Sequence, residues 1–432
     1  MIVKSLFQLS TLLPGPHLPT KTLRLLQSYR LRRAISQAYR DVPYYQKLFN
    51  SNKIRPEDIR TIDDLLRIPI TRKEDLVCLD PIQRTARGTN LEGCIMHMTS
   101  GSSGTPFRIW LSDDDNRLRS LALLRTMQWH GFRITDKVLC IRDMRGLYVS
   151  KKYWFQSAGI LDREYIDLFE KRETILQRLY NSHFDILSGY TSELSVLASE
   201  ILKQRKKALR PKLLYTGAEF LDAKRREIIR EAFGIDPIDL YSTIETGIIA
   251  WQCAKRSGYH INADLMAVEV VRDNQPCPIG EEGELVVTNF FSKITPVIRY
   301  SLGDVATISD KHCSCGCNFP MLKGIAGRLV DCILLPSGKR LSPYTLTCSI
   351  EDIHGLRSYQ ITQTSRHEII INYVSSTSIA TEVSSQIISR LENLLGKGVS
   401  VKTNRVEEIS KKKGKFKVVK SLIAQASDPR AP

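Results

Sequence analysis

Apolar residues follow a helical spacing in the first part of the 432-residue chain. Between residues 21 and 50, leucines, isoleucines and tyrosines recur at helical intervals, until Val42-Pro43 interrupts the run. Residues 51–76 continue with shorter helical patterns, punctuated by Pro56 and Pro69. We therefore predict that helices precede the first strand.

Short apolar runs alternate with helical patterns in the middle of the chain. The strand-like runs are CIMHM, VLCIR and KLLYTG. Helical spacing appears at residues 114–129, 192–204 and 222–233. This alternation predicts an α/β architecture in which most strands are parallel. After Met266, strand patterns succeed one another without helices, which indicates an antiparallel-rich segment.

The pattern changes again after Arg328. The runs SYQITQT, EIIINYV and VSVKTN predict strands, and residues 382–395 predict a helix between the second and the third. These elements suit a compact α+β module of about a hundred residues. The predicted fold class is α/β with two domains: a large α/β domain at residues 1–328 and a small α+β domain at residues 329–432.

Composition indicates a globular protein with a basic surface. Hydrophobic residues make up 42% and charged residues 25%, and 63 Lys and Arg against 46 Asp and Glu give a formal charge of +17. Much of the excess lies at the two ends of the chain, which we expect to be solvated and able to associate weakly with a membrane surface. No nucleic-acid-binding motif accompanies the charge, so nucleic acid is not an expected partner.

The sequence contains neither a membrane span nor an evident export signal. No apolar run is long enough to cross a bilayer, and the mildly apolar N-terminus is short and interrupted by polar residues and prolines. Ten cysteines, most of them scattered singly, favour a reducing compartment over a secreted disulfide scaffold. We therefore expect a cytoplasmic protein.

A candidate structural zinc site is formed by Cys253, His260, Cys313 and Cys315. Thiolates and an imidazole are the ligands that tetrahedral Zn²⁺ takes. Cys317 could replace Cys313 or Cys315, and a group of reduced thiols without metal is the alternative. If all four side chains bind, no coordination position stays open, so the metal would be structural rather than catalytic.

The strongest local signal is an octet rich in glycine, serine and threonine that follows a predicted strand. Its residues are Thr99, Ser100, Gly101, Ser102, Ser103, Gly104, Thr105 and Pro106. Glycines let backbone N–H groups approach an anion, and hydroxyl side chains add donors, so the octet suits a phosphate-binding loop. A flexible linker is the alternative.

Polar residues also follow predicted strands further along the chain. Ligands of open α/β sheets bind beyond the carboxyl ends of the strands. A carboxylate such as Glu245 could hold Mg²⁺ against a triphosphate, and Asp304 could accept hydrogen bonds from two ribose hydroxyls. Arg299 could pair with a phosphate. Taken alone, each of these residues is weak support for a site.

Taken together and in this order, the octet and the segments around Glu219, Glu245, Asp304, Arg328 and Lys415 resemble the adenylate-forming superfamily. That superfamily contains acyl-CoA synthetases, peptide-synthetase adenylation domains and luciferases. Some segments resemble one branch more narrowly: the phenylacetate–CoA ligases, with their relatives associated with capsular polysaccharide genes. These segments are VPYYQKLF, PITRKEDL, TSGSSGTP, LYSTIET and a C-x-C-G element. The resemblance covers nearly the whole chain. It implies a small, mobile C-terminal domain and an active site in the cleft between the two domains.

The resemblance also implies a role for each candidate residue. The octet residues Thr99 to Thr105 would hold the pyrophosphate of ATP. The other nucleotide ligands would be Gly217, Ala218, Glu219, Tyr241, Ser242 and Thr243 near the adenine, Asp304 on the ribose and Arg328 on ribose or phosphate. The residues of the chemical step would be Lys415, bridging the acyl carboxylate and the α-phosphate, and Glu245, binding Mg²⁺. Val330 departs from the hinge Asp or Lys of many relatives.

The implied activity is a ligation in two steps. ATP and a carboxylic acid, with aromatic acids the leading class, would give acyl-AMP and pyrophosphate, and CoA would then take the acyl group as a thioester. One alternative is an amide-forming ligase that uses an amine, such as an amino sugar. Another is a non-catalytic nucleotide-binding relative, against which the presence of Glu245, Asp304 and Lys415 argues. The oligomeric state has no signature in the sequence.

Overall fold

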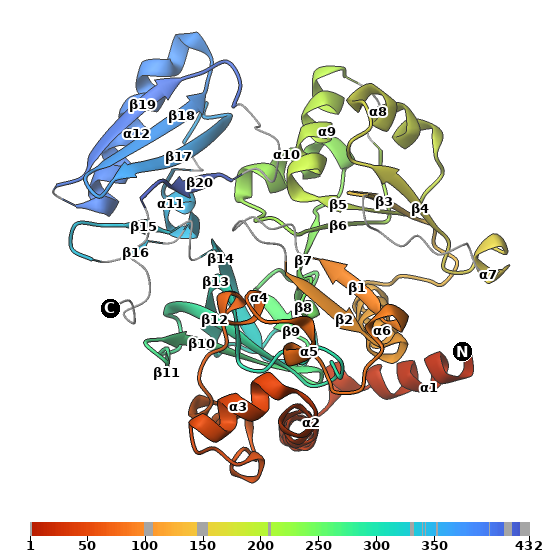
Figure 1. Ribbon diagram of the computed structural model, residues 1–432. Helices are drawn as coiled ribbons and strands as arrows, with labels where there is room; N and C mark the ends of the chain where they lie inside the picture. Colours follow the sequence, from red (N-terminus) through yellow and green to blue (C-terminus); the bar gives the residue numbers. More distant parts are fainter. Residues whose placement is uncertain are drawn as a thin grey trace. The chain divides into compact units, whose positions relative to one another are not determined.

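The computed structural model describes ten stretches of the chain (Figure 1). They are residues 2–98, 107–144, 154–205, 209–328, 332–338, 340–341, 343–350, 353–396, 398–409 and 417–423. The fold divides into two compact units, each made of two separate segments. Unit 1 comprises Met1–Arg133 and Ile238–Gly324, and unit 2 comprises Ile134–Pro237 and Ile325–Pro432.

Unit 1 begins with helices, as predicted. The main ones are α1 (Ile2–Leu12), α2 (Thr20–Asp41) and α3 (Pro43–Ser51). Val42 and Pro43 separate α2 from α3 because the residue before a proline disfavours helical backbone, while the fixed φ of proline suits the first helical position. A 3₁₀ helix, η1 (Gly15–His17), lies between α1 and α2. Short helices follow α3: η2 (Pro56–Asp58), η3 (Ile62–Arg67), α4 (Lys73–Val77), α5 (Pro81–Arg84) and η4 (Leu91–Gly93).

The sheet of unit 1 is antiparallel wherever its pairing is described. A separate hairpin joins β1 (Ile95–Met98) to β2 (Arg108–Leu111), and α6 (Asp113–Trp129) follows it. The sheet strands are β7 (Ile238–Thr243), β8 (Gly247–Gln252), β9 (Tyr259–Ile261), β10 (Met266–Arg272), β11 (Gln275–Pro276), β12 (Glu282–Asn289), β13 (Tyr300–Ser309) and β14 (Met321–Arg328). Their order is β11-β10-β12-β13-β14-β9-β8-β7, which confirms the antiparallel-rich segment predicted after Met266.

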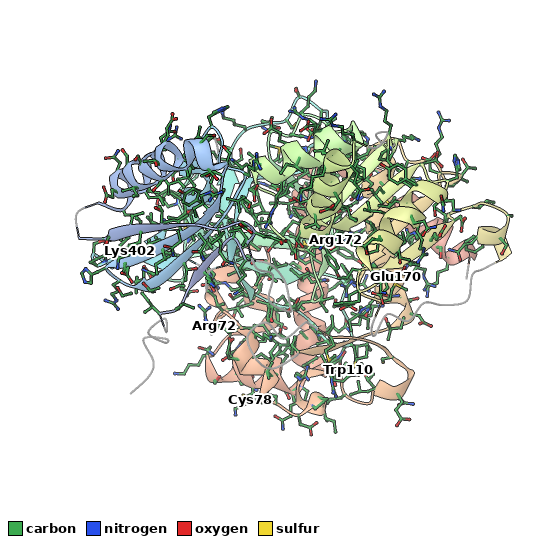
Figure 2. The ribbon with its side chains drawn as sticks, turned by 90° about the horizontal axis from the view of Figure 1, so that it is seen from above. Arg72, Cys78, Trp110, Glu170, Arg172 and Lys402 are labelled. Atoms are coloured by element: carbon green, nitrogen blue, oxygen red, sulfur yellow. The ribbon has the colours of Figure 1, made fainter. Side chains whose placement is uncertain are left out.

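Residues distant in sequence hold unit 1 together. One buried cluster combines Leu31 and Phe49 of the N-terminal helices, and Ile68 just after η3, with Phe290 and Ile298 near the later strands. At the surface of the same unit, the guanidinium of Arg72, labelled in Figure 2, contacts both carboxylate oxygens of Glu284 on β12, at 2.5 and 3.1 Å. Because the two planar groups match in geometry, this pair fixes the start of α4 against the sheet.

The first segment of unit 2 is the parallel part of the fold. Its strands are β3 (Val138–Arg142), β4 (Arg163–Asp167), β5 (Ile186–Tyr190) and β6 (Leu213–Gly217), in the order β6-β5-β3-β4. The helices between and after them are α7 (Trp154–Ser157), α8 (Arg172–Asn181), α9 (Thr191–Lys203) and α10 (Ala223–Phe233). Their buried residues form one cluster, from Leu139 to Phe233. The predicted alternation of strands and helices is therefore confirmed.

The second segment of unit 2 is an α+β module, also as predicted. It contains β15 (Ile333–Leu334), β16 (Arg340–Leu341), α11 (Pro343–Ile350), β17 (Ser358–Ser365), β18 (Glu368–Val374), η6 (Thr377–Ile379), α12 (Ala380–Leu395), β19 (Ser400–Arg405) and β20 (Val419–Ser421). Its main sheet has the order β19-β18-β17-β20. Along α12 a buried residue recurs every fourth position, at Val383, Ile387, Leu391 and Leu395. The module's hydrophobic core draws only on residues between Ile333 and Val419.

None of the described helices is both long enough and apolar enough to cross a membrane.

Candidate functional site

Two residues expected at a nucleotide come together in unit 1. Tyr241 lies on β7 and Asp304 on β13, and the hydroxyl of Tyr241 donates to Asp304 Oδ2 at 2.5 Å. A bulge in β13 turns the aspartate out of the regular ladder, because three residues, from Leu302 to Asp304, stand opposite one residue of β12. Gly303 occupies the left-handed region within this bulge, at φ +69°.

The turn between β7 and β8 carries Glu245. Thr243 Oγ1 and Thr246 Oγ1 lie 2.9 Å apart and close this turn. The hydroxyl of Tyr300 on β13 lies 3.5 Å from a carboxylate oxygen of Glu245. Burial, followed by the negative charge of Glu245, raises the pKa of Tyr300, so the phenol stays protonated and can donate to the carboxylate. Tyr241, Glu245 and Asp304 therefore lie on adjoining parts of one unit, and their roles at the adenine, the magnesium and the ribose stay predictions.

Arg119 of α6 contacts the turn that carries Glu245, and it was not identified from the sequence. Its Nη2 donates to the carbonyl oxygens of Ile244 and Thr243, at 2.8 and 3.3 Å. Burial lowers the pKa of Arg119 to about 10, and the charge of Glu245 acts in the opposite direction. Nη1 is buried and has no hydrogen-bond partner among the described residues. In sequence nothing distinguishes this arginine from Arg117, two positions earlier on the same helix.

The other expected adenine ligands follow β6 in unit 2. Gly217 ends that strand, and Ala218 takes the left-handed backbone region at φ +64°. The carboxylate of Glu219 accepts a hydrogen bond of 2.7 Å from the backbone N–H of Ser192, in the first turn of α9. Because free N–H groups and the helix dipole favour an anion there, the carboxylate of Glu219 has a structural role in capping α9.

Several expected residues lie outside the described part of the chain. They are the octet Thr99, Ser100, Gly101, Ser102, Ser103, Gly104, Thr105 and Pro106, together with Val330 and Lys415. For Arg328, which ends β14, the backbone alone is described. Their roles stay predictions.

The expectation that Arg299 pairs with a phosphate is wrong. Its side chain is fully buried. Its Nε lies 3.2 Å from Glu269 Oε1, and its Nη1 donates to the carbonyl oxygen of Ile68 and to Asn274 Oδ1, at 2.5 and 2.7 Å. Because its charge and hydrogen bonds are engaged inside the protein, Arg299 is a structural residue of unit 1.

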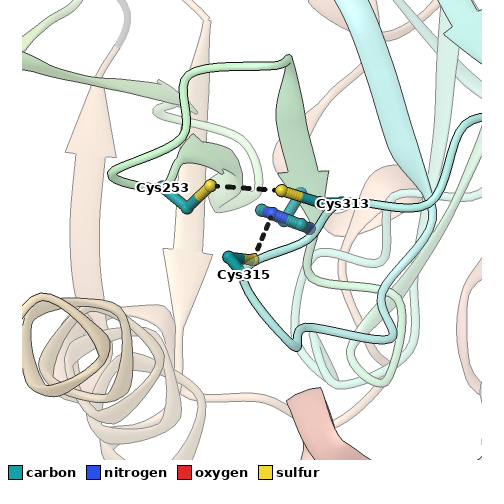
Figure 3. Close-up of side chains that lie close together, drawn as sticks. Cys253, Cys313 and Cys315 are labelled. Carbon is teal, nitrogen blue, oxygen red and sulfur yellow. Dashed lines mark hydrogen bonds between the residues drawn. The ribbon is translucent and has the colours of Figure 1, made fainter.

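The four candidate metal ligands converge as the sequence predicted (Figure 3). Their ligand atoms all lie within 4.8 Å of one another, with 3.5 Å between the sulfurs of Cys253 and Cys313 and 3.3 Å between Cys315 Sγ and His260 Nε2. Cys253 follows β8, His260 lies on β9, and both other cysteines lie in the loop between β13 and β14. Cys317 is buried and does not belong to this group of four.

The surroundings of the cluster suit a bound cation. Burial lowers the pKa of His260, and the backbone of Phe319 offsets this in part, so the imidazole is neutral and able to bind a metal near neutral pH. The Trp251 ring packs against it with centroids 4.9 Å apart, and Ser257 Oγ lies 3.2 Å from Cys313 Sγ. Three sulfurs and one nitrogen form the donor set of a closed zinc site.

Comparison with known proteins finds relatives among acid–CoA ligases. A family model described as the CapK C-terminal domain matches residues 333–422. Phenylacetate-coenzyme A ligase of Thermus thermophilus is 27% identical over 331 residues, which cover 74% of this chain and 73% of that protein. Protein CapK of Staphylococcus aureus is 21% identical over 295 residues, covering 66% of this chain and 63% of that protein.

The fold has close counterparts among solved structures. A crystal structure of 2-hydroxyisobutyryl-CoA ligase, in the postadenylation state with an acyl-AMP, matches with a TM-score of 0.76 and 19% identity. The match covers 94% of this chain and 91% of the other. ATP-bound MatB from Rhodopseudomonas palustris matches with a TM-score of 0.55 over 76% of this chain. The chain thus has the fold of adenylate-forming ligases and resembles their phenylacetate–CoA ligase branch, including the CapK relatives.

Proposed function

We propose that this protein is an ATP-dependent acid–thiol ligase that forms an acyl-adenylate and then a CoA thioester. The observation that carries the proposal is the meeting of Tyr241 and Asp304 beside the Glu245 turn, in a chain with the adenylate-forming fold. An aspartate at a bulge within a strand can accept hydrogen bonds from ribose hydroxyls, and the aromatic ring of Tyr241 can lie against a purine. A cytoplasmic location, where ATP and CoA are available, fits this reaction.

The first step requires charge compensation. A carboxylate that attacks the α-phosphate of ATP brings two anions together, so cations and N–H donors must offset their repulsion. In our proposal Lys415 bridges the two anions, Glu245 holds the Mg²⁺ that neutralises the triphosphate, and the octet from Thr99 to Thr105 binds the departing pyrophosphate. Gly217 and Ala218 line the adenine through their backbone, and Arg328 binds ribose or phosphate.

An amine acceptor is the second candidate for the second step. In our proposal the C-terminal module, which the CapK model matches, completes the site for either acceptor. An amide-forming ligase would keep every adenylation residue and exchange the CoA thiol for an amine, such as that of an amino sugar. Aromatic acids are the first class of acyl substrate to test in either case.

The cysteine and histidine cluster belongs to the same proposal as a structural zinc site. Cys253, His260, Cys313 and Cys315 would hold the metal with no coordination position left for substrate. Its role would be to fix the loop between β13 and β14 against β8 and β9. No step of the reaction passes through it.

The decisive experiment measures pyrophosphate release from ATP and Mg²⁺ across a panel of carboxylic acids, aromatic acids first, with and without CoA. We expect release that depends on one acid, and mass spectrometry should detect a thioester when CoA is present. Release without a thioester, with an amide formed from an added amine, would establish the second candidate. If ATP binds and no acid in a broad panel supports release, adenylation is refuted.

Lys415 provides the sharpest single-residue test. The variant Lys415→Ala should lower the rate of acyl-AMP formation by about 100-fold or more, because it removes the cation between the two reacting anions. ATP binding and the melting temperature should change little. Lys412→Ala, in the same basic segment, is the matched control and should retain activity. Equal rates in both variants would reject the assignment of Lys415.

A further inference from the structure

Polar side chains of α1 contact α6, and one large apolar side chain of α1 is exposed. Lys4 Nζ lies 2.6 Å from Asp114 Oδ2, and Arg117 Nε donates to Gln8 Oε1 at 2.9 Å; both partners lie on α6. Phe7, between Lys4 and Gln8 in sequence, is 69% exposed. Leu13, just after the helix, is also exposed, whereas Leu12 is buried. Phe7 and Leu13 are therefore apolar side chains that the described part of this segment leaves in contact with solvent.

Helix α2 exposes several positively charged side chains. Between Lys21 and Arg40 it contains no acidic residue. Its exposed cations are Lys21, Arg24, Arg32, Arg33 and Arg40. Arg40 pairs with Asp41 at 2.7 Å. Among the described residues, no carboxylate lies within ion-pair distance of the other four, so their charge is directed to the solvent.

Exposed apolar side chains and a surface hollow lie among these cations. Leu25 is 65% exposed, and Tyr29, also exposed, lies under the guanidinium of Arg33 at 5.6 Å. A surface hollow of about 470 Å³ is lined by Tyr29, Arg32, Arg33, Ser36, Gln37 and Arg40. Arg32, Arg33 and the hydroxyl of Ser36 are suited to an anionic phosphate group at this hollow, where Arg40 already pairs with Asp41.

We propose that the exposed surface of α1 and α2 docks on an anionic membrane. Four of the twelve large hydrophobic side chains that the described residues expose fall between Phe7 and Tyr29, and two of them, Leu25 and Tyr29, lie on α2 with the five exposed cations. Apolar side chains that insert among lipid tails, flanked by cations that meet lipid phosphates, are the features of an interfacial protein surface. A nucleic acid would also attract the arginines, but it would gain little from Phe7 and Leu25.

The test uses the full chain and co-sedimentation with vesicles. We expect binding to vesicles of phosphatidylcholine mixed with phosphatidylglycerol, and binding at least tenfold weaker to phosphatidylcholine alone or in high salt. The double variant Arg32→Glu/Arg33→Glu should weaken partitioning by roughly tenfold or more. Arg32→Gln/Arg33→Gln should fall between this variant and the wild type, and circular dichroism checks that each remains folded. Arg357→Glu/Arg366→Glu, at exposed sites of the C-terminal module, is the charge-matched control and should bind normally.

The apolar part of the surface separates a membrane from other polyanions. Phe7→Ser/Leu25→Ser should weaken vesicle binding several-fold and leave any binding to double-stranded DNA unchanged. Ile279→Ser, at another strongly exposed apolar residue, is its control. Absence of vesicle binding would overturn the proposal. So would binding that the Phe7 and Leu25 changes do not alter and that DNA competes away, since the surface would then be a general polyanion site.

Discussion

The guanidinium of Arg119 donates to the carbonyl oxygens of Thr243 and Ile244, directly before Glu245. Arg119→Met should therefore lower kcat for pyrophosphate release by about 10- to 100-fold and raise the Mg²⁺ concentration needed for half-maximal rate. Arg119→Lys should recover part of the loss. Kinetics over a Mg²⁺ series measure both effects, and Arg230→Met, at an exposed arginine, is the control. A lower melting temperature with unchanged Mg²⁺ dependence would make Arg119 purely structural.

Arg125 and Asp264 form a buried ion pair in unit 1. Arg125 Nη1 and Nη2 contact the two carboxylate oxygens at 2.6 and 3.0 Å, and the side chains are 3% and 1% exposed. Arg125→Met should lower the free energy of unfolding by about 3–5 kcal/mol, because the buried carboxylate loses both hydrogen bonds from Arg125 and, among the described cations, keeps only Arg30, at 3.9 Å. Urea denaturation measures this loss. Arg178→Met, at the more exposed Arg178–Glu170 pair, should cost about 1 kcal/mol or less.

Residue types predicted some of the site but not the surroundings of each residue. Cys253 and His260 were identified because few side chains bind zinc, and the structure brings them together with the two distant cysteines. Arg299 was misassigned because its partner Glu269 is 30 positions away and nothing local marks the pair as buried. Arg119 was missed for the same reason: its role depends on a turn more than 120 positions later.

At the scale of elements, periodicity predicted most strands and helices, but not how the strands pair. The run ending at Met98 was expected within the main α/β pattern, and it forms β1, which pairs only with β2 in a separate hairpin. Alternation predicted the parallel strands β3 to β6 because each connection contains a helix. The bulge that directs Asp304 is a matter of register between two strands, which no single run of residues reveals.

The metal cluster should stabilise the loops that meet in it. We expect about one zinc per chain in protein purified under reducing conditions, measured by elemental analysis. A strong chelator or Cys253→Ser should lower the melting temperature, because the loop between β13 and β14 would lose its link to β8 and β9. Cys78→Ser, at an exposed cysteine outside the cluster, should change neither quantity. Zinc that persists in Cys253→Ser/Cys315→Ser protein would place the metal elsewhere.

At the scale of the whole molecule, the C-terminal module has a core of its own. The buried cluster among its described residues runs from Ile333 to Val419, and the family model covers nearly the same range. A fragment of residues 329–432 should therefore fold alone and unfold cooperatively, which thermal circular dichroism would measure. A fragment of residues 1–133 is the matched control and should not fold, because its core needs Phe290 and Ile298. Non-cooperative melting of the first fragment would contradict the predicted boundary at Arg328.

The same dependence of Ile68 on Ile298 has a consequence during protein synthesis. Ile68 and Ile298, the final member of this cluster, lie about 230 positions apart in the sequence. At typical elongation rates the ribosome needs roughly 10 to 50 seconds to add that length. For this interval the N-terminal helices emerge without the strands that cover them, so the nascent chain exposes apolar surface that a chaperone can bind. Chaperone limitation should accordingly harm the yield of the full chain more than that of the C-terminal fragment.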